Sequence, residues 1–145
     1  MSAIFVDTWA WCALTNKGDS QHDSAKQLQK KMLERDYDYI TTNYVIDESY
    51  TLIRSRVGIQ PSIEFHNRLE RSKEAGFLEI SRINTILEKQ AWEMFVKFDD
   101  VDDLSFTDCT SFALMEQRNM REVFTGDAHF QYAGFIKRNN PSNLS

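Results

Sequence analysis

The sequence has little of several residue types that would direct it to a specialised class of protein. Only two cysteines occur among the 145 residues, Cys12 and Cys109. Two cysteines make no disulfide framework, and we expect both to be buried, inert thiols in a reducing cytoplasm. No apolar run approaches the roughly 20 residues that a membrane-spanning helix needs. The opening MSAIFV lacks the basic segment and the long apolar run of a signal peptide. A cytoplasmic protein without a membrane segment is therefore expected.

Residues that interrupt helices and strands are also scarce. Two prolines and five scattered glycines mark no linker, and no repeat or low-complexity tract is present. Apolar residues make up 41% of the chain and charged residues 27%, a balance that argues against disorder. We expect one domain over residues 1–138, followed by a polar tail at 139–145.

Positive charge is the remaining shortage. The chain has 17 Lys and Arg residues against 22 Asp and Glu residues, and its formal net charge is −5. Passive binding to nucleic-acid phosphates needs clustered Lys and Arg, so this balance argues against it. It permits a protein that gathers carboxylates around metal ions or binds a cationic partner.

Short apolar segments alternate with amphipathic ones along the chain. Buried strands are predicted at 3–7, 37–42, 77–81 and 122–125, with a short fifth at 135–138. Helices are predicted at about 21–34, 43–56, 61–76, 86–98 and 105–118. Strands that alternate with helices predict an α/β protein whose parallel sheet is covered on both faces.

Two of the predicted strands end near an aspartate, although they lie at opposite ends of the sequence. Asp7 follows AIFV, and Asp127 follows EVFTG. In parallel sheets the ligand site lies beyond the carboxyl ends of the strands, where the chain order switches direction. The two aspartates are therefore expected to share one crevice. Simple turn chemistry is the alternative for Asp127, because Gly and Asp both favour tight turns.

Two further acids are expected to face the same crevice from the starts of helices. Glu48 falls on the apolar face of its helix, whereas the neighbouring Asp47 falls on the solvent face. An inward carboxylate is unfavourable unless it is paired, protonated or bound to a cation, and a backbone N–H or an arginine would also satisfy it. Asp108 has capping-box spacing from Ser105, so helix capping is the simpler alternative for this acid.

These four acids, taken together, predict a metal site. Carboxylates this close would repel one another and raise one another's pKa values unless cations intervened. Oxygen ligands suit Mg²⁺ or Mn²⁺ rather than zinc. Such ions support phosphodiester cleavage, so the group predicts a metal-dependent nuclease. Accidental grouping remains open, because the chain has 22 acids to choose from.

Three segments resemble a PIN domain, and most of all the VapC toxins of bacterial type II toxin–antitoxin systems. They are FVDTWAW, TTNYVIDESYTLI and LSFTDCTSFALMEQRNMREVFTGDAHFQYAGF, and the resemblance extends from about residue 3 to 135. It implies a three-layer α/β/α sandwich around a parallel sheet of four to five strands. It also implies an Mg²⁺- or Mn²⁺-dependent endoribonuclease, usually a homodimer, and a small antitoxin partner whose C-terminal segment blocks the active site.

The resemblance also assigns roles by position. The four motif acids are Asp7, Glu48, Asp108 and Asp127. The first three are expected to hold a metal directly, and the fourth to complete the site through a water or a second ion. Thr8 and Thr125 match hydroxyl positions beside the metal.

Two neighbours of the motif acids are also of note. His129 follows Asp127 closely and is expected to be structural. Trp9 stands where many relatives have a small residue, which would narrow the site or move substrate contacts.

RNA phosphates are expected to contact arginines on two segments, Arg54 and Arg56 on one and Arg118 and Arg121 on the other. Ordinary solvated arginines are the alternative. The phosphodiester is common to tRNA, rRNA and mRNA, so the substrate is not specified.

Three other functions are alternatives to this one. A haloacid dehalogenase-type phosphatase needs a second aspartate two residues after the first, and Trp9 occupies that position. A catalytically silent PIN-like module that binds RNA or a partner would lack one of the acids, and none is missing. A general RNA-processing nuclease without an antitoxin remains open.

Overall fold

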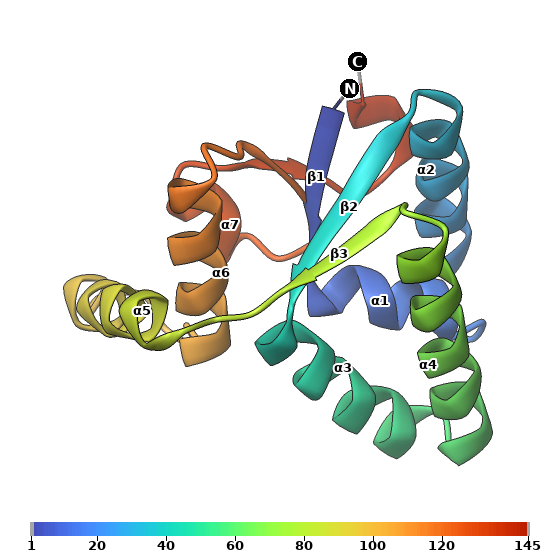
Figure 1. Ribbon diagram of the computed structural model, residues 1–145, viewed down its shortest axis with the longest axis horizontal. Helices are drawn as coiled ribbons and strands as arrows, with labels where there is room; N and C mark the ends of the chain where they lie inside the picture. Colours follow the sequence, from blue (N-terminus) through green and yellow to red (C-terminus); the bar gives the residue numbers. More distant parts are fainter. Residues whose placement is uncertain (1, 145) are drawn as a thin grey trace.

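The computed structural model describes residues 2–144, in which five strands and seven α-helices follow one another (Figure 1). The strands are β1 (Ser2–Val6), β2 (Tyr37–Thr42), β3 (Leu78–Ser81), β4 (Glu122–Phe124) and β5 (Ile136–Arg138). The helices are α1 (Thr8–Thr15), α2 (His22–Glu34), α3 (Asn43–Arg56), α4 (Ile59–Glu74), α5 (Thr85–Lys97), α6 (Phe106–Gln117) and α7 (His129–Tyr132). A 3₁₀ turn, Pro141–Asn143, follows β5.

All five strands pair in parallel, in the order β3-β2-β1-β4-β5. The chain builds the sheet outward from β1 to β3 on one side and then returns to add β4 and β5 on the other. The direction therefore switches between β1 and β4, where Phe5 pairs with Val123 and Val6 with Phe124. The crevice beyond the carboxyl ends of β1 and β4, at this switch point, is where an α/β sheet holds its ligands. The predicted α/β fold with a parallel sheet of four to five strands is confirmed.

Helices cover both faces of the sheet. On one face Phe5 of β1 lies near Phe130 of α7, whose ring centroid is 5.0 Å from that of Phe112 of α6. On the other face Trp11 of α1 packs edge-on against Tyr39 of β2 at 6.3 Å. Ile4, Phe5 and Val6 of the central strand β1 are fully buried, as expected for a parallel strand that is covered on both faces.

Helix α1 was not predicted. Its sequence TWAWCALT is apolar on nearly every side, and six of its eight residues are buried. Because it lacks an amphipathic period, the pattern does not distinguish it from a continuation of the buried strand. Asp7 begins the helix by accepting hydrogen bonds at its backbone carbonyl from the N–H groups of Ala10 and Trp11. The short helix α7 was also missed.

Residues 139–144, predicted as a polar tail, pack against α2. Leu144 is buried, and the Lys31 ammonium group donates hydrogen bonds to the carbonyl oxygens of Pro141 and Leu144 at 2.8 and 3.0 Å. Within residues 2–144 no helix combines the length and apolar character needed to cross a bilayer. Cys12 and Cys109 are both buried and unpaired, and burial raises the pKa of each thiol to about 11, so the prediction of inert thiols agrees with the structure.

Candidate active site

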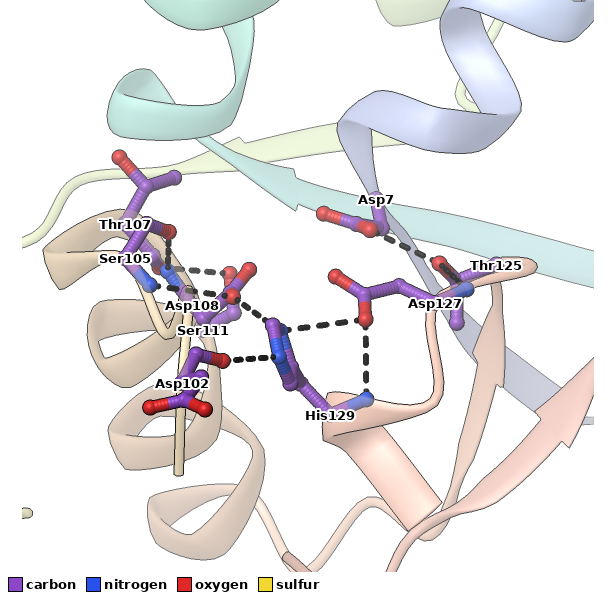
Figure 2. Close-up of polar contacts among 9 residues, drawn as sticks. All are labelled: Asp7, Asp102, Ser105, Thr107, Asp108, Ser111, Thr125, Asp127 and His129. Carbon is purple, nitrogen blue, oxygen red and sulfur yellow. Dashed lines mark hydrogen bonds and ion pairs between the residues drawn. The ribbon is translucent and has the colours of Figure 1, made fainter. Parts of the chain in front are cut away.

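Three of the four predicted acids converge at the carboxyl edge of the sheet. Figure 2 shows Asp7 from the end of β1, Asp108 from the first turn of α6, and Asp127 from the loop after β4 directing their carboxylates toward one space. Asp7 is 4% exposed and Asp108 is 8% exposed. One ligand atom from each of Asp108, Asp127 and His129 lies within 4.8 Å of the others. The topology therefore assembles the acids as the strand-end argument predicts.

A single hydroxyl joins the two strand-end aspartates. Thr125 is fully buried, and its Oγ1 donates a hydrogen bond to Asp7 Oδ2 at 2.8 Å. The same oxygen accepts the backbone N–H of Asp127 at 3.0 Å. Because strands β1 and β4 are neighbours, this threonine fixes the separation between the Asp7 side chain and the Asp127 backbone.

Asp108 is held by the capping box that its spacing predicts. The Ser105 hydroxyl accepts the Asp108 N–H at 2.9 Å, and the Ser105 N–H donates to Asp108 Oδ2 at 3.4 Å. A capping role had been the alternative to a site role. The structure shows that the two are compatible, because the capping carboxylate also points into the acid cluster (Figure 2).

His129 lies between two of the acids. Its Nδ1 is 3.2 Å from Asp108 Oδ2 and 3.2 Å from Asp127 Oδ1, and its Nε2 is 3.0 Å from the carbonyl oxygen of Asp102. A carbonyl only accepts, so Nε2 carries a proton. Burial disfavours charge on the ring, but Asp127 and Asp108 outweigh it and raise the pKa of His129. The ring holds the two carboxylates in place, which is a structural role as expected, through contacts that its sequence position did not reveal.

The electrostatics of the cluster disfavour three free charges. Burial, followed by the charge of Asp108, raises the pKa of Asp7 from 3.8 to about 7, against the opposing hydrogen bond from Thr125. Burial, followed by the charge of Asp127, raises the pKa of Asp108 to about 6. Such values are typical of carboxylates gathered for chemistry or for a cation.

Glu48 lies on α3, outside the group of Asp108, Asp127 and His129 whose ligand atoms lie within 4.8 Å of one another. It is half-buried on α3, and Asp47 beside it is exposed, as the helix period predicts. Its charge acts on Cys12 of α1, where burial and the charges of Glu48 and Asp7 raise the thiol pKa while Arg56 opposes them. Glu48 thus faces the α1 side of the crevice.

The structure does not bring the four candidate arginines to the acids. Arg54 and Arg56 are exposed near the end of α3, and only Arg56 acts electrostatically on the α1 side of the crevice. Arg118 pairs with Glu79 of β3. Arg121 directly precedes β4, so it lies at the amino end of the strand whose other end leads to the acids.

The donors present fit a divalent metal ion. Two buried carboxylates with raised pKa values gain from a nearby cation, which removes their mutual repulsion. Thr8 follows Asp7 directly, and its Oγ1 is buried without a hydrogen-bond partner within residues 2–144. A buried hydroxyl that finds no protein partner beside crowded carboxylates is consistent with oxygen ligands for a hydrated cation.

Comparisons with known proteins agree with this geometry. The chain matches the PIN domain family over residues 4–136. It is 33% identical over 134 residues to the 23S rRNA-specific endonuclease VapC20 of Mycobacterium tuberculosis, covering 92% of this chain and 96% of VapC20. The crystal structure of M. tuberculosis VapC20, described as a sarcin–ricin loop cleaving toxin, matches with a TM-score of 0.77 and 31% identity, over 92% of this chain and 96% of that one.

More distant structures share the fold alone. VapBC2 of Rickettsia felis, bound to a DNA fragment from its promoter, matches with a TM-score of 0.67 at 13% identity, over 95% of this chain and 98% of that one. FitAcB of Neisseria gonorrhoeae matches with a TM-score of 0.64 at 18% identity, over 97% and 99%. The family match and the identity to VapC20 confirm the resemblance expected from the motifs, and this chain belongs to the PIN domain family.

Proposed function

We propose that this protein is a metal-dependent endoribonuclease and the toxin of a toxin–antitoxin pair. The observation that carries the proposal is the convergence of Asp7, Asp108 and Asp127 at the switch point of a PIN-family sheet, with two of these carboxyl groups buried. Mg²⁺ or Mn²⁺ is the proposed ion, because hard oxygen donors dominate the site.

The roles of the residues follow from their contacts. Asp7, Asp108 and Asp127 would hold the ion together with Glu48 of α3. When bound, such an ion activates water and offsets the charge that develops on a phosphate. Thr125 keeps Asp7 in register with the loop that carries Asp127. No general base is assigned to a histidine.

Structured ribosomal RNA is the proposed substrate class. VapC20 is named as specific for 23S rRNA and as a cleaver of the sarcin–ricin loop, and this chain covers 96% of it at 33% identity. An RNA hairpin with the sarcin–ricin sequence is therefore the first defined substrate to test.

The experiment uses purified protein, free of any partner, and total RNA with Mn²⁺, Mg²⁺ or EDTA. Wild type, Asp108→Asn and the exposed control Asp47→Asn are compared, and the cut ends are sequenced. We expect cuts that need the metal and Asp108 but not Asp47. Metal-independent cuts that Asp108→Asn also makes would refute the proposal.

An antitoxin segment is proposed to occupy the groove between α2 and α4. The groove has a volume of about 630 Å³, and Lys26, Lys30, Arg68 and Arg71 contribute its only charges among the described residues that line it. Its apolar lining includes the half-exposed Phe77. Among residues 2–144, four basic side chains line the groove and no acidic one does, although the whole chain has a net charge of −5. The groove therefore favours a partner segment that carries both carboxylates and apolar side chains.

Co-expression with the protein encoded by the adjacent gene tests this partner. We expect a stable complex that inhibits cleavage, and we expect Arg68→Glu with Lys30→Glu to weaken it without changing the metal-dependent activity of the free toxin. Unchanged affinity in this double variant would place the antitoxin elsewhere.

A homodimer is also proposed, from the resemblance. Helix α5 carries three well-exposed apolar side chains, Ile86, Trp92 and Val96, which a second copy could cover. Light scattering on wild type and on Val96→Glu tests this arrangement, and a wild type that is monomeric at micromolar concentration would contradict it.

A further inference from the structure

Trp9 lies next to the aspartate cluster and has no role in holding it. It is the second residue of α1, two residues after Asp7. Its indole lies against Gly126, the residue between Thr125 and Asp127. A Cβ atom placed on Gly126 would lie 2.3 Å from Cε2 and 2.5 Å from Nε1 of the indole, far inside contact distance. Only glycine at 126 therefore lets the ring occupy this position beside the acids.

The indole remains available to a ligand. Trp9 is only partly buried, and its Nε1–H has no acceptor within residues 2–144. Among the described residues, only Thr8 Oγ1 is a side-chain polar atom that is both buried and without a partner. The unpaired Nε1 of Trp9 is therefore accessible to solvent. Trp11, two residues further on, differs: it is 7% exposed and its Nε1–H donates to Thr41 at 3.4 Å. One tryptophan thus completes the core, and the other lies beside the crevice.

The residues that contact the aspartate cluster offer little positive charge to an RNA phosphate. Among the described residues, the polar contacts of the three aspartates involve His129 but no Lys or Arg. A nuclease of net charge −5 with this site needs another source of affinity close to the cut phosphate. Aromatic stacking supplies affinity for an unpaired base without charge, and single-stranded RNA loops are recognised in this way.

We propose that Trp9 stacks on the unpaired base of a nucleotide that flanks the phosphodiester that is cut. This inference rests on the proposed ribonuclease function. Gly126 lies against the ring between Thr125 and Asp127, so a base stacked on the indole would bring the adjoining phosphate toward the neighbouring aspartates. A base within a duplex has both faces covered by its neighbours, so Trp9 selects loops over helices.

The first test measures cleavage of a hairpin RNA with the sarcin–ricin sequence in Mn²⁺. Trp9→Leu keeps an apolar side chain without an aromatic ring, and Trp9→Phe keeps a ring. We expect Trp9→Leu to raise KM roughly 5- to 150-fold with a much smaller change in kcat, and Trp9→Phe to remain within a few-fold of wild type. Removing the base of the contacted nucleotide should weaken wild type by the same factor and leave Trp9→Leu unaffected.

The second test does not depend on cleavage. The same hairpin is titrated in EDTA into wild type, Trp9→Phe and Trp92→Phe, and tryptophan fluorescence is recorded. Trp92 is 57% exposed on α5 and serves as the control. We expect quenching in wild type and Trp92→Phe and its loss in Trp9→Phe.

The outcomes separate the two proposals. Fluorescence quenching that persists in Trp9→Phe overturns the stacking proposal. The proposal is also overturned if removal of the base weakens wild type and Trp9→Leu by the same factor. Quenching through Trp9 without any metal-dependent cut overturns the ribonuclease function while supporting RNA stacking. If Trp9→Leu fails to fold, as its melting curve would show, the fluorescence comparison alone decides. A wild type that neither binds nor cuts the hairpin overturns both proposals for this RNA.

Discussion

Replacing Asp7 by asparagine should stabilise the metal-free protein while abolishing activity. The Asp7 carboxyl group has a pKa of about 7 in the fold against 3.8 in the unfolded chain, chiefly because it is buried and lies near Asp108. The folded state therefore binds the Asp7 proton more tightly than the unfolded chain does. The contribution of Asp7 to the free energy of unfolding is thus greatest at low pH. It falls as the pH rises from about 4 to about 7 and levels off above that range.

The magnitude follows from this shift. Each pKa unit corresponds to about 1.36 kcal/mol, so the ionised Asp7 destabilises the metal-free fold by at most about 4 kcal/mol at pH 8. Asparagine removes the charge and can still accept the Thr125 hydroxyl at 2.8 Å, but it pairs less well with the Thr8 N–H. We expect a net gain of about 2–3 kcal/mol in the free energy of unfolding, or roughly 6–12 °C in Tm.

Thermal melting at pH 5 and pH 8, in EDTA and in Mn²⁺, measures this prediction. Asp7→Asn should melt above wild type in EDTA at pH 8, and the difference should shrink at pH 5. Mn²⁺ at a hundredfold excess over its Kd should stabilise wild type by about 2.7 kcal/mol and the variant by less. The exposed control Asp47→Asn should match wild type throughout. A variant that melts at or below wild type in EDTA at pH 8 would refute the argument that Asp7 is a strained charge.

Three further predictions concern neighbouring residues. Glu48→Gln should abolish cleavage of the RNA hairpin whereas Asp47→Asn should not, and the opposite result would mean that the helix face is wrongly assigned. Thr125→Val removes the hydroxyl shared by two acids and leaves the partly buried Asp127 N–H unpaired. Chemical denaturation should therefore show a loss of about 1–3 kcal/mol together with reduced kcat. An unchanged kcat would contradict the positioning role. Gly126→Ala should lose about 1–3 kcal/mol by clashing with the indole, and Trp9→Ala should remove most of that loss, so additive losses in the double variant would count against the contact.

The parts of the fold that follow from periodic patterns could be predicted from the sequence. The five strands and the capping box of Ser105 and Asp108 agree with the structure because they depend on local spacing. The parallel arrangement of the sheet also agrees, because it follows from the alternation of strands and helices, whereas the order of the strands was not predicted. Helix α1 was missed because burial on nearly all sides removes the period that identifies a helix. A helix is identified by the alternation of apolar and polar positions, and α1 has almost no such alternation.

The site was predicted in part for a related reason. Strand ends in a parallel sheet meet at one edge, so the pairing of Asp7 with Asp127 follows from topology. The position of His129 depends on the loop after β4 folding back toward α6, a tertiary contact that no periodicity reports. The arginines illustrate the opposite case, in which residues close in sequence lie apart in the fold. Arg118 and Arg121 precede β4 and Asp127 follows it, so the strand places them at opposite edges of the sheet.

The three-aspartate metal centre is the central claim, and the metal dependence of RNA cleavage tests it most directly. An end-labelled hairpin with the sarcin–ricin sequence is incubated with wild type and with Asp7→Asn across a Mn²⁺ titration that starts from EDTA. The account predicts one defined cut that rises with Mn²⁺ in wild type and is absent from Asp7→Asn at every concentration. Cleavage by wild type in EDTA, or equal cleavage by Asp7→Asn, would contradict it.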